Sequence, residues 1–93
     1  MGADTSSLPG HDLVEKGLHD LARGERTVES LLVSIGASRL RRLGLVLDAP
    51  FADAERSLYD QLALEGADAA HSRYNALVRR LVSFERAAEC AAR

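Results

Sequence analysis

The stretch "RYNALVRRLVSFER", residues 73–86, decides the fold of this chain. Its large apolar side chains recur at spacings of three and four residues, and the same spacing continues on both sides of the stretch. The complete seam is Ala70, Tyr74, Leu77, Leu81, Phe84, Ala88 and Ala91. Such alternating spacings place all of these side chains on one side of a helix over three heptads. We therefore expect a long C-terminal helix, capped by Asp68, with this seam against an apolar surface.

The seam can pack against other helices of the same chain or against a second copy. A chain of 93 residues buries a modest core, and small folds often complete their core by oligomerising. The large side chains at the middle of the seam would anchor such an interface: Tyr74, Leu77, Leu81 and Phe84. We predict a homodimer through these residues, and the alternative is that the core of one chain uses them entirely.

The composition favours helices throughout the chain. Leu and Ala number fifteen each, whereas Val and Ile together number seven, and Ala and Leu lose little conformational freedom in a helix. Residues 1–10 are small and polar, which predicts a flexible tail. Residues 11–93 are then a single helical domain.

Local signals divide this domain into helices. The predicted helices cover residues 11–23, 28–35, 39–43, 54–64 and 69–91, and an extended connector over residues 45–51 lies on the core. The predicted N-caps are Thr27, Ser38, Asp53 and Asp68, and the predicted stops are Gly24, Gly44 and Gly66. Because residues 28–43 are interrupted by Gly36, the fold is predicted as all-α, a compact array of four helices with the second broken in two. The last helix is its spine, and short connections permit up-down packing.

Charge alternates along the chain in blocks. Residues 1–29 and 48–72 are acidic, with net charges of −3 and −5, whereas residues 30–47 and 73–93 each carry +3. We expect the basic segments to lie beside the acidic ones. On the last helix, Arg79 and Arg86 point away from the seam, while the other two arginines share one flank. If the outward ridge binds anything, an acidic protein or a phosphate backbone is the predicted class of partner.

Residues 27–45 have the outline of a helix-turn-helix, which gives a second functional hypothesis. A helix, a turn at Gly36 and a basic helix with Arg39, Arg41 and Arg42 could contact phosphates or bases. The motif usually has a small residue where Leu32 stands and a buried aliphatic residue where Arg42 stands, and Gly44 ends the basic helix early. The net charge of −2 also weakens attraction to DNA. DNA binding is therefore the alternative rather than the leading prediction.

No motif of an enzyme, metal site or phosphate loop occurs in the sequence. Glu15 and His19 could share a helix face, but the sequence supplies no third metal ligand. Cys90 is the only cysteine, and we expect an exposed, unreactive thiol near a helix C-terminus. The N-terminus lacks signal-peptide features and no apolar run reaches membrane-spanning length. We predict a cytoplasmic, non-enzymatic regulatory module without a cofactor, whose partner is a second copy or another protein.

Overall fold

The computed structural model describes residues 7–91, and all regular structure within that range is helical. The elements are α1 (His11–Ala22), α2 (Val28–Ile35), α3 (Ala37–Arg42), α4 (Ala54–Glu65), a 3₁₀ turn η1 (Ala67–Ala69) and α5 (Ala70–Ala91). The all-α prediction is confirmed, including the long last helix and the break at Gly36. Most of the predicted tail, residues 1–6, lies outside the described residues, and Leu8 packs half-buried against the core.

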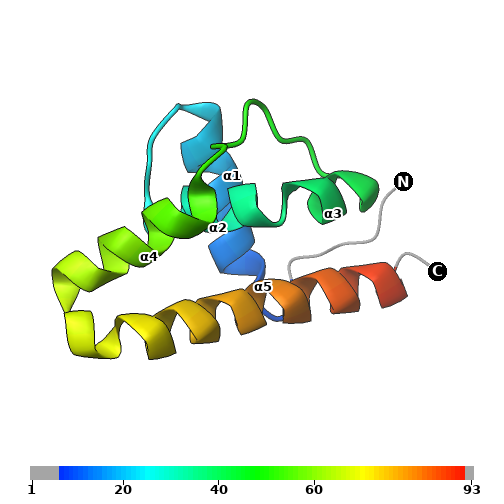
Figure 1. Cartoon of the computed structure of the whole chain (residues 1–93). Coiled ribbons are helices and arrows are strands. Elements are labelled where there is room, and N and C mark those ends of the chain that lie inside the picture. Colours follow the sequence, from blue (N-terminus) through cyan, green and yellow to red (C-terminus); the bar gives the residue numbers. More distant parts are fainter. Residues whose placement is uncertain (1–6, 92–93) are drawn as a thin grey trace.

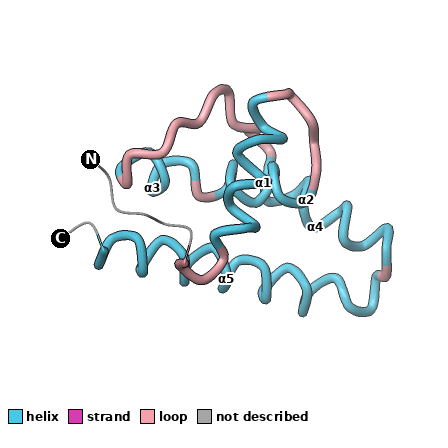
Figure 2. Tube along the Cα trace, turned by 180° about the vertical axis from the view of Figure 1, so that it is seen from behind, coloured by secondary structure: helices cyan, strands magenta, loops and turns pink. Residues whose placement is uncertain are grey.

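The helices do not form a regular up-down bundle. α4 and α5 meet at a sharp corner, seen at the left of Figure 1, and α1 runs across the direction of α5. The view from behind in Figure 2 shows the same crossing. α2 lies at the centre of the array, because it contacts α1, α3, α4 and α5.

The core forms around α2 and the second half of α5. Leu31, Leu32 and Val33 of α2 are fully buried, as are Leu58 and Leu62 of α4. Leu81, Phe84 and Ala88 are the buried residues that the second half of α5 contributes to this core. Tyr59 follows Leu58 on α4 but does not share its burial, since its side chain is 39% exposed and lies beside Tyr74.

Two predicted caps are confirmed at their positions and two are wrong. Thr27 caps α2: its Oγ1 accepts a hydrogen bond from the Ser30 amide at 3.1 Å, and its own amide donates to Ser30 Oγ at 2.8 Å. Asp53 occupies the N-cap position of α4 without a cap hydrogen bond from its side chain. Ser38 lies inside α3, which already begins at Ala37, and Asp68 lies in the 3₁₀ turn before α5.

The connector between α3 and α4 has no regular secondary structure over residues 45–51. Leu47 is buried and Leu45 is half-buried, whereas Val46 is 82% exposed. Side chains of α2 and α3 bind the main chain of the connector: Arg41 Nη2 donates to the Leu47 carbonyl at 3.0 Å, and the Phe51 amide donates to Ser34 Oγ at 3.1 Å. Part of this segment therefore lies on the core.

Candidate functional site

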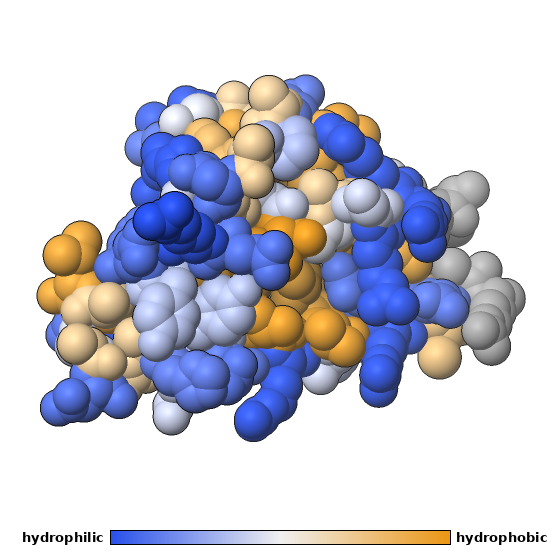
Figure 3. Space-filling model, in the orientation of Figure 1, coloured by the Kyte–Doolittle hydropathy of each residue, from blue (hydrophilic) through white to orange (hydrophobic). Residues whose placement is uncertain are grey.

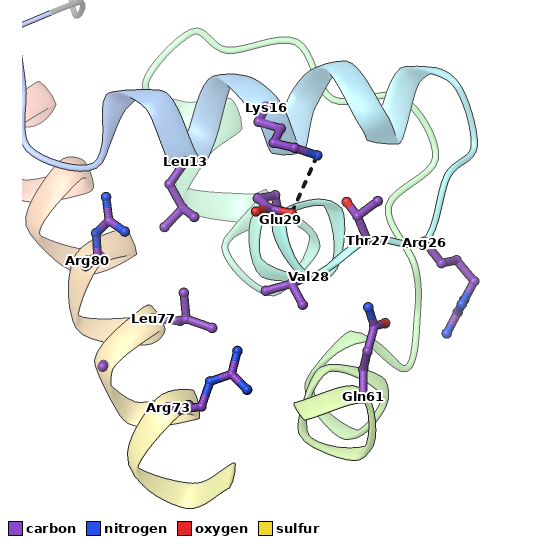
Figure 4. Close-up of a pocket in the computed structure, with 11 residues that line it drawn as sticks. Leu13, Lys16, Arg26, Thr27, Val28, Glu29, Gln61, Arg73, Leu77 and Arg80 are labelled. Atoms are coloured by element: carbon purple, nitrogen blue, oxygen red, sulfur yellow. Dashed lines mark ion pairs between the residues drawn. The ribbon is translucent and has the colours of Figure 1, made fainter. Parts of the chain in front are cut away.

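A cleft of about 610 Å³ opens between α1, the start of α2, α4 and the first half of α5 (Figure 4). Its floor is apolar: Leu13, Val28 and Leu77, from three different helices, point toward one another. Leu13 is buried, while Val28 and Leu77 are half-buried and pack against the core. Open apolar surface of this kind is suited to receiving a side chain from a ligand or a partner.

Positive side chains surround the floor. Lys16, Arg26, Arg73 and Arg80 all line the cleft, whereas Glu29 is the only acidic residue among residues 7–91 that lines it. Arg73 and Arg80 come from α5 on either side of Leu77, at positions i, i+4 and i+7, so all three lie on one face of that helix. Arg26 is turned away toward the start of α4, where its guanidinium lies 4.6 Å above the Phe51 ring.

Each of these cations has an acidic neighbour within the chain. Arg73 Nη1 lies 2.9 Å from Glu65, and Arg80 Nη2 lies 3.5 Å from Asp12. Neither acid lines the cleft, and the Asp12 side chain is 85% exposed. Exposed ion pairs contribute about 0–1 kcal/mol each. An incoming carboxylate could therefore exchange with these partners at little cost.

A polar cluster beside the cleft fixes α1 against the start of α2. Asp20 is buried and accepts hydrogen bonds from Lys16 Nζ at 2.6 Å and from Thr27 Oγ1 at 2.7 Å. These two bonds hold the pKa of Asp20 below its ordinary value, and the bond from Lys16 has the larger effect. The same bond raises the pKa of Lys16. Lys16 also lies 3.7 Å from Glu29 (Figure 4). The ammonium at this edge of the cleft is thus held in place by two carboxylates.

The predicted interface residues separate into two pairs. Leu81 and Phe84 are 2% and 1% exposed in the single chain, so their apolar atoms are already covered. Tyr74 is half-buried, with its ring centroid 5.9 Å from that of Tyr59, and burial raises the pKa of its hydroxyl. Leu77 lies in the floor of the cleft. Of the four predicted anchors, these two retain surface for a partner.

The predicted contact arginines also differ in their surroundings. Arg39 lies 3.6 Å from the buried carboxylate of Glu85, and Arg41 donates to the Leu47 carbonyl. Arg42, Arg79 and Arg86 are exposed, and none of them forms an ion pair with another residue in the range 7–91. The structure therefore does not gather the five arginines into one site.

Sequence reasoning missed most of the cleft. The spacing of Arg73, Leu77 and Arg80 was the available signal, since it places two cations beside a leucine on one helix face. The contributions of Leu13 and Val28 depend on how α1 and α2 cross in front of α5, and neither residue carries a local sign of it.

The histidines lie apart from this cleft floor. His11 Nε2, rather than His19, pairs with Glu15, at 2.6 Å, and His19 Nδ1 lies 3.7 Å from Asp20. Within the described part of the chain, no group of three or more His, Cys, Asp or Glu side chains is arranged to hold a metal ion. Cys90 is exposed, as predicted.

Comparisons with protein-family models, curated proteins and solved structures give no match for this chain. No helix within residues 7–91 is both long enough and apolar enough to cross a membrane. Function is therefore inferred from the chemistry of the cleft itself.

Proposed function

We propose that the chain is a non-enzymatic helical interaction module, and that its cleft binds an acidic segment of a partner protein that presents an apolar side chain. One observation carries the proposal. Leu13, Val28 and Leu77 form an apolar floor, and Arg73 and Arg80 lie on either side of Leu77 along α5. An apolar side chain would fill the floor, and carboxylates beside it would face the guanidinium groups.

The two parts of such a ligand would contribute differently. Covering a leucine-sized side chain is worth about 1.5–3 kcal/mol. The carboxylates would add mainly specificity and a faster association, because they meet arginines that already have exposed acidic neighbours. We therefore expect a weak, reversible complex whose affinity falls as salt is added.

The location of the interface differs from the one that the heptad seam suggests. Leu81 and Phe84 support the core of a single chain, so a partner that contacted them would have to displace α1 or α2. Of the four predicted anchors, Leu77 is the one that lines the cleft. The interaction proposal thus keeps α5 as the central element and moves the contact surface to its first half.

DNA binding through residues 27–45 has less support from the geometry. α3 is a helix of six residues, Arg39 is paired with Glu85, and Arg41 is bound to the connector. Of the three arginines, Arg42 alone has neither an ion pair nor a side-chain hydrogen bond among the described residues. This hypothesis remains a prediction, and a DNA duplex serves as a comparison ligand in the test below.

Fluorescence polarisation with a labelled synthetic helix tests the proposal. The probe carries one leucine with glutamates one turn before and one turn after it, and two control peptides replace the leucine by serine or the glutamates by glutamines. We expect the probe to bind at least about tenfold more tightly than either control peptide, because it alone supplies both kinds of contact.

Matched protein variants locate the binding. Arg73→Gln/Arg80→Gln should weaken the probe about tenfold. Arg79→Gln/Arg86→Gln removes the same charge from the exposed ridge of the same helix and should leave affinity unchanged. Equal losses in the two double variants, binding of the control peptides as tight as that of the probe, or preference for the DNA duplex would contradict the proposal.

A further inference from the structure

Leu64 is the most exposed large apolar side chain in the described part of the chain, at 88%. It lies in the last turn of α4, at the corner where α4 meets α5, and Figure 3 shows apolar surface at that corner. Acidic residues flank it along the chain: Asp60 one turn earlier, Glu65 next to it and Asp68 beyond Gly66, all of them exposed. We call Leu64 with these three acids the acidic corner.

The acidic corner has the chemistry that the cleft is proposed to bind. We infer that the partner is a second copy of this chain, with its Leu64 seated between Leu13, Val28 and Leu77 and its carboxylates facing Arg73 and Arg80. This inference rests on the proposed function and names its ligand. It follows from charge complementarity, since the corner belongs to an acidic block of net charge −5 and the arginines to a basic block of +3.

The positions of the two surfaces permit a reciprocal exchange. Gln61 lines the cleft and Leu64 follows it by three residues on α4, so the corner lies beside one edge of the cleft. Within one chain Leu64 stays exposed and does not enter that cleft, whereas Glu65 already pairs with Arg73 at 2.9 Å. Two copies related by a two-fold axis can each give one corner and receive one. The Glu65–Arg73 pair would then be exchanged for equivalent pairs between copies.

Sedimentation velocity of the full chain over a range of concentrations tests the inference. We expect a reversible monomer–dimer equilibrium in the wild type, and at least about tenfold weaker dimerisation in Leu64→Ser. Val46→Ser is the matched control, because Val46 is similarly exposed but lies in the connector between α3 and α4. The control should dimerise like the wild type.

Three outcomes overturn the inference: a wild type that is monomeric at every concentration, a Leu64→Ser variant that dimerises normally, and equal losses in both variants. The synthetic probe separates these outcomes from failure of the proposed function. Leu64→Ser keeps an intact cleft and should bind the probe. A wild type that is monomeric but still binds the probe would refute dimerisation and leave the proposed function standing. Because Leu64 is so exposed, circular dichroism should show unchanged helix content in the variant.

Discussion

Glu85 is a carboxylic acid in the core, at 4% exposure, on the seam side of α5. Its Oε1 lies 3.6 Å from Arg39 Nη1, and its Oε2 would lie 2.7 Å from a Cβ added at Gly36, where α2 and α3 meet. Burial raises the pKa of Glu85 above its ordinary value of 4.5, and Arg39 offsets part of that shift. The Glu85 side chain therefore packs against Gly36 at the break between α2 and α3, where a larger residue would collide with it.

The raised pKa predicts a pH dependence of stability. The folded state holds the proton of Glu85 more tightly than the unfolded state, so the stability that this group contributes is fully present below its unfolded pKa and is lost as pH rises through the folded pKa. Glu85→Gln removes this loss. Urea unfolding should show the variant gaining stability relative to the wild type between about pH 4 and pH 7.

A surface replacement separates this effect from a general change in charge. Glu55→Gln alters an exposed residue of α4 and serves as the control. If the difference between Glu85→Gln and the wild type stayed constant across the pH range, or changed in the opposite direction, the buried carboxylate would not be responsible.

Contact between α1 and α2 depends on a glycine in the middle of α1. A Cβ added at Gly17 would meet the carbonyl oxygen of Glu29 and would lie 2.7 Å from Val33 Cγ1, so the two helices approach closely at this point. Because the obstacle is partly backbone, it cannot be relieved by a change of rotamer alone. The close approach also sets the distance between Leu13 of α1 and Val28 of α2 in the floor of the cleft.

Replacement of Gly17 should therefore destabilise the fold even though alanine is the better helix former. We expect Gly17→Ala to lower the free energy of unfolding by about 2 kcal/mol, since overpacking exceeds the roughly 1 kcal/mol gain in helix propensity. Gly66→Ala is the control: its φ of 171° is extended, and apart from its chain neighbours no atom of residues 7–91 lies within 4 Å of an added Cβ. Urea unfolding should show it within about 0.5 kcal/mol of the wild type. A Gly17→Ala variant as stable as the control would mean that α1 and α2 separate freely.

Local signals predicted the helices well where one residue decides the boundary. Thr27 caps α2 because its hydroxyl reaches the Ser30 amide, and Gly24 and Gly44 follow the ends of α1 and α3. The prediction for Ser38 failed because α3 already begins at Ala37. The prediction for Asp68 failed because a 3₁₀ turn, rather than a cap, precedes α5. Such changes depend on neighbouring helices, so a list of good cap residues does not predict them.

At the scale of the whole molecule, periodicity predicted the face of α5 but not what covers each part of it. Leu81 and Phe84 lie in the core, whereas Leu77, on the same seam, is left in the cleft. The charge blocks were a partial guide, since Arg73 and Arg80 do pair with acids from the predicted acidic segments, at Glu65 and Asp12. The cleft itself could not be predicted, because it arises where α1 crosses α5.

Nuclear magnetic resonance of the uniformly ¹⁵N-labelled full chain, titrated with the leucine–glutamate probe, tests most directly whether this cleft is the binding site. Dilute protein keeps self-association low during the titration. We predict saturable amide shifts centred on Leu13, Val28 and Leu77, with little change in α3 (Ala37–Arg42). Shifts centred on α3, shifts spread evenly over all five α-helices, or no shifts at saturating probe would contradict the account.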